Sequence, residues 1–476
     1  MQTTFSRLAV PDPQTPVTNN IDTADRVDRK GTQRERLIAG MITACSRHGY
    51  EGANVSRTIA LAGVSRPTFY EYFNDKHDCF LAAHGELARL LVWEVERAVS
   101  AVGPDQAVQA AIRRFVELSQ EYPDRADLLT NETMAGDRAA LNAHDRMMKQ
   151  MAEVVERARA KASAQTPTPD LPIQMVFGAG RWLLAPALRR GEHNLSALAD
   201  DLTSWVDSYM TPSAEHRWNT LDPGPVLPPS PHASEISLRP PAPIPPGRPR
   251  LSRAEVARNQ RERILYATAA VAAAKGYGAS TIADITAGAG VDRGVFYKHF
   301  RDKQQAFLAV HELAVHQLMA LAASAFFSVT SWPDRVWEAM RATTQFEAAN
   351  PIITHIGHVE SHAVGAAAIQ RVDDSRAAFT IFLQEGSQLM GTPPSRIAME
   401  AIGGAVFEIG YHQVRRGHSD QLARLAPLAT YLVLAPFLGP AATNEFIDEK
   451  LEEAAAELRD TDHRQPPGEP RLSQIL

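Results

Sequence analysis

Residues 49–76 read GYEGANVSRTIALAGVSRPTFYEYFNDK, and residues 276–303 read GYGASTIADITAGAGVDRGVFYKHFRDK. The second stretch repeats the first at a constant offset without a gap. The identical positions include Gly63, Arg66, Phe69, Phe73 and Lys76, which recur as Gly290, Arg293, Phe296, Phe300 and Lys303. A repeat with so long a period indicates a duplicated domain, because the units of solenoid proteins are far shorter.

The composition is that of a soluble globular protein, with 44% hydrophobic and 22% charged residues in a chain of 476. The two cysteines fit a reducing compartment. The N-terminus lacks the pattern of a signal peptide, and no apolar run is long enough to suggest a membrane partner. These features predict a cytoplasmic location.

Basic charge is concentrated in the two copied segments. The formal net charge of the chain is −6, which by itself argues against a polyanionic partner. Residues 26–76 nevertheless hold nine Lys and Arg against five Asp and Glu, and residues 248–303 hold eleven against five. Local charge steers binding to nucleic acid more than the total does.

Apolar residues recur at helical spacing along both halves, and alternating strand patterns are not found. The sequence therefore predicts an all-α protein with two domains in tandem, each with an N-terminal three-helix unit followed by further helices. The expected divisions are a disordered tail (1–29), a first domain (30–210), a proline-rich linker (211–251), a second domain (252–440) and a C-terminal tail with a charged helix (441–476).

The copied segment has the pattern of a helix-turn-helix. Asn54 and Thr281 suit the N-cap of a short helix. That helix ends at Gly63 and Gly290, where a turn benefits from a residue that tolerates positive φ. Ser65 and Asp292 then cap another helix that opens with arginine. The expected helix-turn-helix units span about 33–77 and 260–304, and their last helix is expected to enter the major groove of DNA.

The strings GVSRPTFYEYFNDK and GVDRGVFYKHFRDK resemble the TetR family of bacterial transcriptional regulators. The resemblance covers about 50 residues in each half. It implies a double-stranded DNA operator as partner, a helical regulatory domain after each DNA-binding unit, and dimerisation through the last two long helices. In this chain the matching pairs are 172–190 with 196–210 and 394–416 with 420–437. We expect them to pack within one chain as a pseudo-dimer, with a chain-swapped dimer as the rival arrangement.

The first turns of the two recognition helices are expected to carry the DNA contacts. Arg66 and Arg293 are placed to reach guanine O6 and N7. The other expected contact residues are Asn54, Ser65, Pro67, Thr68, Tyr70, Tyr72, Thr281, Asp292, Gly294, Val295, Tyr297, Lys298 and His299. Lys76 and Lys303 resemble the family's phosphate-binding lysine. Arg248 and Arg250, in a Gly-Arg-Pro-Arg stretch of the linker, resemble an arm that enters the minor groove, although incidental linker arginines are the alternative.

Some positions depart from the family pattern. Thr58 replaces the usual isoleucine and Arg57 the usual acid, which predicts a weaker second helix in the first domain. Pro67 and Asp292 also replace the usual small residue and serine. Asp292 near DNA would be repulsive unless it acts only as a cap.

The resemblance also implies an effector pocket in each regulatory domain. The candidate lining residues are Trp93, Met134, Met147, Phe177, Trp182, Trp337, Phe346, His355, His358 and Tyr411. A mostly apolar pocket favours a small hydrophobic or acyl-type effector. His355, His358 and His362 share a helical face, so a metal-responsive regulator is an alternative, but no cofactor and no metal site are predicted.

The sequence carries none of the enzyme motifs considered: a phosphate-binding glycine loop, a Gly-x-Ser-x-Gly elbow or a His-Glu-x-x-His helix. The favoured function is therefore a DNA-binding regulator, namely a repressor that its effector releases from DNA. The alternative is an architectural DNA-binding protein without a ligand. Because the two recognition helices differ in sequence, the expected operator has two unlike half-sites.

Overall fold

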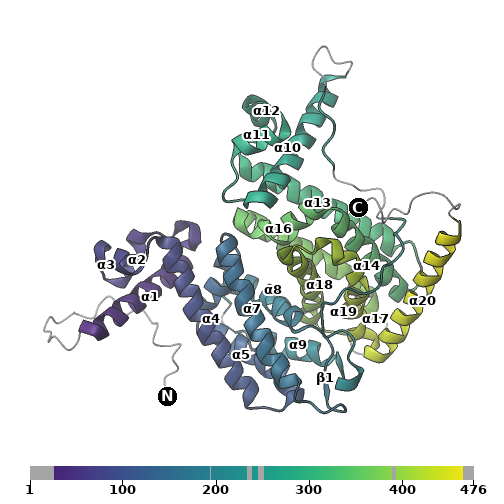
Figure 1. Cartoon of the computed structure of the whole chain (residues 1–476), viewed down its shortest axis with the longest axis horizontal. Helices are drawn as coiled ribbons and strands as arrows, with labels where there is room; N and C mark the ends of the chain where they lie inside the picture. Colours follow the sequence, from purple (N-terminus) through teal and green to yellow (C-terminus); the bar gives the residue numbers. More distant parts are fainter. Residues whose placement is uncertain (1–25, 193, 233–238, 245–250, 389–392, 465–476) are drawn as a thin grey trace. The chain divides into compact units, whose positions relative to one another are not determined.

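The computed structural model describes residues 26–192, 194–232, 239–244, 251–388 and 393–464 (Figure 1). The chain divides into two compact units. Unit 1 comprises Met1–Thr168, Val176–Val206 and Pro212–Ala214, and unit 2 comprises Pro169–Met175, Asp207–Thr211 and Glu215–Leu476.

The all-α architecture with two tandem domains is confirmed. The helices of the first repeat are α1 (Arg26–Gly52), α2 (Val55–Ala62), α3 (Arg66–Tyr72), α4 (Lys76–Ser100), η3 (Pro104–Gln106), α5 (Ala107–Glu121), α6 (Pro123–Asp127), η4 (Leu128–Glu132), α7 (Arg138–Arg159), α8 (Ile173–Arg189) and α9 (Ser196–Asp207). Two short strands, β1 (Pro167–Pro169) and β2 (Met210–Pro212), pair with each other, and η5 (Ser213–Glu215) follows.

The second repeat is also helical. Its helices are α10 (Arg253–Lys275), α11 (Ile282–Ala289), α12 (Arg293–His299), α13 (Lys303–Phe326), α14 (Trp332–Ala349), α15 (Pro351–His358), η6 (Glu360–Val364), α16 (Ala366–Phe379), η7 (Thr380–Leu383), α17 (Gln384–Gln388), α18 (Arg396–Arg416), η8 (Ser419–Leu425), α19 (Ala426–Leu438) and α20 (Pro440–Arg464).

The stretch 351–386 consists of several short helical pieces, and the clearest break is at Gly365, whose φ of 106° is not helical. At the other end of the chain, residues 26–29 belong to α1 and not to a disordered tail, while residues 1–25 lie outside the described part.

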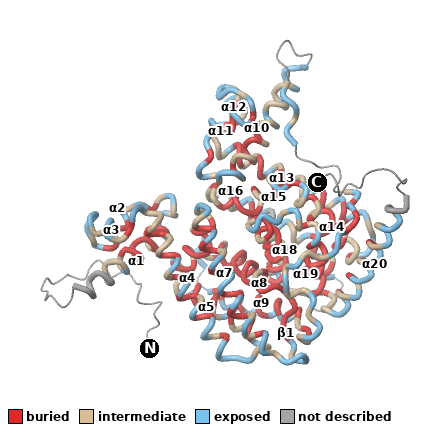
Figure 2. The backbone as a smooth tube through the Cα atoms, viewed as in Figure 1, coloured by how far each residue is buried: buried red, intermediate tan, exposed pale blue. Residues whose placement is uncertain are grey.

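Each three-helix unit has its own small core. In unit 1, Phe69 of α3 is fully buried and packs against Phe73, with ring centroids 5.7 Å apart. In unit 2, Phe296 and Phe300 occupy the same places, 5.9 Å apart. Figure 2 shows buried backbone on the inner side of each three-helix unit and exposed backbone along α3 and α12. The recognition helices therefore keep one face free for a partner.

Residues from the end of the expected first domain and from the expected linker form part of unit 2. Tyr209 donates a hydrogen bond to the Leu432 carbonyl at 2.7 Å, and the Trp218 ring stacks on Tyr431 at 5.3 Å. Arg217 makes a two-pronged ion pair with Asp448, at 2.7 and 2.8 Å. The stretch 211–232 is thus a packed segment instead of a free spacer. Residues 233–238 and 245–250 of the expected linker lie outside the described part.

Two helical stretches of unit 2, Lys303–Phe326 and Ser419–Leu438, are long and apolar enough to cross a membrane by composition alone. The second is 78% buried in the core of unit 2. The apolar surface of such a helix is satisfied by packing, so its composition is explained without a bilayer.

Candidate DNA-reading surfaces and effector cavity

Side-chain caps hold both helix-turn-helix units in the expected form. Asn54 accepts from the Arg57 amide at 2.9 Å at the start of α2. Thr281 and Asp284 form a reciprocal capping box at the start of α11. Gly63 and Gly290 end these helices in the left-handed conformation, with φ near 60°, where a side chain would be strained.

The recognition helices α3 and α12 begin at the expected residues. The Ser65 hydroxyl accepts from the Thr68 amide at 3.2 Å, and the Asp292 carboxylate accepts from the Val295 amide at 2.8 Å. Asp292 is therefore a helix cap, and its negative charge lies at the end of the helix dipole that favours it.

The exposed face of each recognition helix contains most of the expected contact residues. Arg66 is exposed and donates to Ser56 Oγ at 2.9 Å, whereas Arg293 is exposed and lies over the Tyr297 ring. Tyr70 and Tyr297 leave about half of their surface in solvent. The other exposed members are Pro67, Gly294 and Lys298, and Thr68 and Val295 are half-buried.

Tyr72 and His299 lie differently from the rest. Both are half-buried at the inner edge of their helix, and the Tyr72 hydroxyl is 3.5 Å from Gln33 Oε1 of α1. Burial, together with the charges of Arg261 and Lys298, lowers the pKa of His299. These side chains connect the recognition helix to the first helix of its own unit, which limits their reach toward DNA.

The ammonium groups of Lys76 and Lys303 are engaged inside the protein. Lys76 Nζ donates to the carbonyls of Tyr50 at 3.0 Å and Ala53 at 3.2 Å. Lys303 Nζ donates to three carbonyls, those of Tyr277, Gly278 and Ser280, at 2.8, 3.3 and 2.9 Å. Since an ammonium group has only three hydrogens to donate, Lys303 could contact a phosphate only by releasing one of these bonds.

These lysines belong to an arrangement we call the Gly-Tyr anchor, which consists of Gly49, Tyr50, Lys76 and Glu132 in unit 1. The Lys76 ammonium also lies 4.4 Å from the centre of the Tyr50 ring. The Tyr50 amide donates to a carboxylate oxygen of Glu132, at the end of η4. The anchor thus ties the end of α1 both to α4 and to the regulatory helices.

Unit 2 repeats the anchor with Gly276, Tyr277, Lys303 and Glu360. The Tyr277 amide donates to Glu360 Oε2 at 2.6 Å, and Lys303 lies 4.3 Å from the centre of the Tyr277 ring. The two acids were missed because they lie 82 and 83 residues after their tyrosines, beyond the copied segment and one position out of register. Only the shared spacing of Gly, Tyr and Lys was visible in the sequence.

The acid of the anchor is buried differently in the two units. Burial, helped by the charge of Asp127 and opposed by the hydrogen bond from the Tyr50 amide, raises the pKa of Glu132 to about 7. Glu360 instead has the His355 Nε2 atom 3.2 Å from its other oxygen. The carboxylate of unit 2 therefore has an imidazole neighbour.

The two residues of α2 that depart from the family pattern, Arg57 and Thr58, both donate hydrogen bonds to backbone carbonyls. Thr58 is fully buried, and its hydroxyl donates to the Asn54 carbonyl at 3.0 Å. Arg57 donates to the Gly52 carbonyl at the end of α1. Arg57 is thus bonded to the end of α1 and does not close a capping box on Asn54. Arg248 and Arg250 lie outside the described residues.

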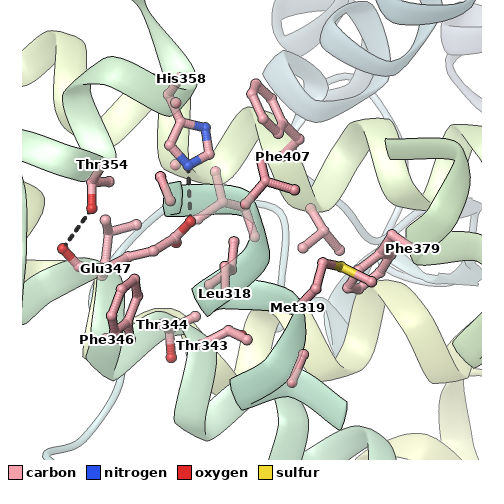
Figure 3. A pocket seen from close by; sticks show the side chains of 18 of the residues that line it. Leu318, Met319, Thr343, Thr344, Phe346, Glu347, Thr354, His358, Phe379 and Phe407 are labelled. Atoms are coloured by element: carbon pink, nitrogen blue, oxygen red, sulfur yellow. Dashed lines mark hydrogen bonds and ion pairs between the residues drawn. The ribbon is translucent and has the colours of Figure 1, made fainter. Parts of the chain in front are cut away.

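A cavity of about 160 Å³ lies within the regulatory helices of unit 2. Its walls come from α13, α14, α15, α16 and α18, with single contributions from η8 and α19. Figure 3 shows Phe346, Phe379 and Phe407 around it, with Glu347 and His358 joined across it. Ile353 lines this cavity and also belongs to the apolar core that holds α10 and α12.

Two of the ten expected pocket residues, Phe346 and His358, line this cavity. Trp337 and Tyr411 are buried elsewhere in unit 2, and His355 faces Glu360. In unit 1, Met134, Met147, Phe177 and Trp182 are buried, and Trp93 is 46% exposed with Arg97 against its ring. Such exposure is not what a buried pocket residue would show, so Trp93 is a surface residue.

The three histidines of the metal alternative do not converge. α15 ends at His358, so His362 leaves the helical face that the sequence suggested. His355 pairs with Glu360, and His358 Nε2 lies 2.9 Å from Glu347 Oε1. Within the described ranges, no group of three His, Cys, Asp or Glu side chains is placed to hold a metal ion.

The sequence model of the family described as bacterial regulatory proteins, tetR family, matches residues 42–83 and 264–310. These two matches coincide with the helix-turn-helix units of the two repeats. The chain therefore carries two DNA-binding units of the TetR family in tandem.

Known TetR-family relatives are transcriptional regulators. The regulator RutR of Escherichia coli K12 is 23% identical over 24% of this chain and 54% of its own length. The repressor AcnR of Corynebacterium glutamicum is 36% identical over 13% of this chain and 34% of its own length. The chain thus spans about half the length, or less, of the curated relatives it matches.

A solved TetR-family structure from Rhodococcus RHA1 is 26% identical and aligns with 37% of this chain and 96% of its own, with a TM-score of 0.32. Each repeat of the chain thus carries a helix-turn-helix of the TetR-family type. The geometry above indicates which side chains those two units present.

Proposed function

We propose that this TetR-family protein is a repressor that reads an asymmetric operator through two unlike helix-turn-helix units. We further propose that a small hydrophobic effector in the cavity of unit 2 releases it from DNA. In this scheme the protein works in the cytoplasm, at the nucleoid, and is not an enzyme.

The difference between the exposed faces of α3 and α12 carries the proposal. The first face presents Arg66, Pro67 and Thr68, and the second presents Arg293, Gly294 and Val295. A proline ring, a hydroxyl and a bare backbone offer different shapes and bonds to base edges. Two identical heads would favour a palindrome, whereas these favour two unlike half-sites.

The walls of the cavity give a route from the effector to the reading head of unit 2. α13 begins directly after α12, and α15 packs against α10 through Ile353 and Ile356. Glu360, just after α15, holds the Tyr277 amide of the Gly-Tyr anchor. An effector that fits one arrangement of α15 better than another would therefore change the setting of the head, by differential affinity for two states.

Selection of DNA from a random pool with the full-length protein tests the operator. The expected result is two dissimilar half-sites, protected together in a footprint. Equal affinity for symmetrised operators built from either half would contradict the asymmetric reading. If the protein stays bound to DNA in the presence of every ligand that fills the cavity, the architectural alternative is favoured instead.

We also propose that the chain functions as an intrachain pseudo-dimer, with α8 and α9 matched against α18 and α19. Light scattering of the purified protein checks this arrangement. A particle of about one chain mass, 52.1 kDa, is expected on dilution. A particle of twice that mass at every concentration would favour the chain-swapped dimer.

A further inference from the structure

The polar groups around the cavity of unit 2 are almost all hydrogen-bond acceptors. Thr343 and Thr344 use their hydroxyl hydrogens to bond the carbonyls of Ala339 and Met340, each at 2.7 Å. Thr354 likewise donates to the Glu347 carbonyl at 2.9 Å. A hydroxyl has one hydrogen to donate and two lone pairs, so these three side chains can offer only lone pairs to a ligand.

A carboxylate and an imidazole stand among these hydroxyls. Glu347 on α14 accepts at Oε1 from His358 Nε2 on α15, at 2.9 Å, and His358 is only 5% exposed. When Nε2 carries the only ring proton and donates it to Glu347, Nδ1 offers a lone pair; this atom is buried and has no hydrogen-bond partner among the described residues. Figure 3 shows the hydrogen bond between Glu347 and His358 among lining side chains that are mostly apolar.

The position of the His358 ring is fixed by its neighbours. Phe407 lies against it, with ring centroids 4.2 Å apart. On another side the ring fills the space that a side chain at Gly410 would need, since a Cβ there would overlap the imidazole. Glycine at this position of α18 therefore accommodates the histidine, and the acceptor at Nδ1 is held in place.

The cavity lining contains no lysine or arginine among its described residues. His311 is the remaining ionisable group, and burial lowers its pKa to about 4, so it is neutral near pH 7. The positive charge of Arg371 contributes to this lowering, while Glu312 opposes it. An anionic ligand group would thus meet a carboxylate and lone pairs with no cation to balance it, which is costly in a buried site.

We propose that the cavity binds a small, mainly apolar molecule whose hydroxyl or amino group donates hydrogen bonds to Glu347 and the neighbouring threonines, and that it rejects organic acids. This ligand class is named for the effector site of the proposed function, on which it rests. It narrows the hydrophobic or acyl-type effector expected from the sequence to a molecule without a free acid group.

The volume sets the size of a first probe. An apolar cavity of about 150 Å³ can take a benzene ring, and this cavity measures about 160 Å³. A substituted single ring is therefore the scale of ligand that fits without rearrangement. Three probes of equal size differ only in the head: 4-methylbenzyl alcohol, 4-methylbenzylamine and 4-methylbenzoate.

Calorimetric titration of the full-length protein with the three probes tests the ligand class. The alcohol and the amine are expected to bind at least about tenfold more tightly than the benzoate, because one hydrogen bond to a charged group is worth about that factor. Equal or tighter binding of the benzoate would overturn the proposal, and so would a failure of both donor probes to bind.

Two variants connect the preference to the cavity. Glu347→Gln should reduce the advantage of the amine over the benzoate to below about threefold, because the amide removes the negative charge and adds a donor. Glu453→Gln is the matched control, since this exposed acid of α20 pairs with Lys450 outside the cavity. It should leave all three affinities unchanged, and an equal effect of both substitutions would contradict a local role of Glu347.

Thr343→Val offers a second readout if Glu347→Gln does not fold. Valine keeps the shape of threonine and removes one acceptor, so binding of the alcohol should weaken about threefold while the benzoate stays as weak as before. Unchanged binding of the alcohol would remove Thr343 from the proposed site.

An assay of DNA release shows whether the proposed ligand class or the proposed effector role has failed. If the alcohol binds in the cavity and the operator complex is unaffected, the effector role fails and the ligand class stands. If an acid releases the operator while the alcohol and the amine do not, the ligand class fails and the effector role stands.

Discussion

α3 and α12 both open with an arginine, bury one phenylalanine on the inner face and end next to a second. Between these fixed points every exposed position except the tyrosine has changed. Glu71 stands on the first helix where Lys298 stands on the second, so the two faces also differ in charge. The two buried phenylalanines, the first arginine and the tyrosine are thus shared by both helices, and the remaining exposed positions differ.

The largest expected difference between the two helix-turn-helix units is in the stability that the lysine of each Gly-Tyr anchor contributes. Lys303→Met should lower the free energy of unfolding by about 3 kcal/mol and Lys76→Met by about 2 kcal/mol, because three and two charge-assisted bonds are lost. Urea denaturation measures both. Lys149→Met, at an exposed lysine of α7, should change little. Normal stability combined with a shallower salt dependence of DNA binding would restore the phosphate-binding role expected from the sequence.

The acid of the first anchor predicts a pH dependence for unit 1. Glu132 holds a proton more tightly in the folded state, with its pKa raised from 4.5 to about 7. Stability must then fall as the pH rises from about 4.5 to about 7, by about 2 kcal/mol after allowance for partial exposure, and stay level above that range. Urea midpoints of Glu132→Gln at both ends of this range should lack that fall.

The effect of Glu132 on stability must be distinguished from those of His84 and of the bulk charge. Burial lowers the pKa of His84 to about 4, so this histidine makes stability rise between about pH 4 and 6.5 and opposes the glutamate. The difference between wild type and variant isolates Glu132. Glu51→Gln, at an exposed acid beside Tyr50, is the control, and a difference as large as that of Glu132→Gln would mean that bulk charge is responsible.

Substitution of the first arginine of each recognition helix tests whether each helix reads its own half-site. Arg66→Ala and Arg293→Ala should each weaken operator binding about tenfold, and each should relax base preference in one half-site only. Competition assays with operators altered in one half measure this. Arg89→Ala, at an exposed arginine of α4, should leave binding unchanged. If both substitutions relax the same half-site, the two heads do not read DNA independently.

The charge difference between Glu71 and Lys298 should have the smallest effect. Glu71→Lys should raise DNA affinity about threefold and steepen the salt dependence by up to about one counterion, and Lys298→Glu should do the reverse. Binding measured over a range of salt concentrations gives both slopes. A slope that neither substitution alters would place these residues away from the phosphates.

Local chemistry in the sequence was enough to predict the helix-turn-helix frame. A cap such as Ser65 and a turn such as Gly63 depend on neighbours within a few residues, and both are where the pattern indicated. The anchor acids and the cavity depend on contacts distant in sequence. Phe346 lines a space while Trp337 fills one, and both have the same apolar signature, so periodicity alone does not tell them apart.

The segment around Trp218 bears on how the duplicated gene can be edited. Tyr209 and Trp218 precede the second repeat by more than thirty residues, yet they cover Tyr431, and Arg217 holds Asp448. A half-gene cut just before α10 would encode a second repeat with this surface stripped and Asp448 unpaired. A cut before α10 would therefore not yield an intact second repeat, because part of its packing is supplied by residues translated before it.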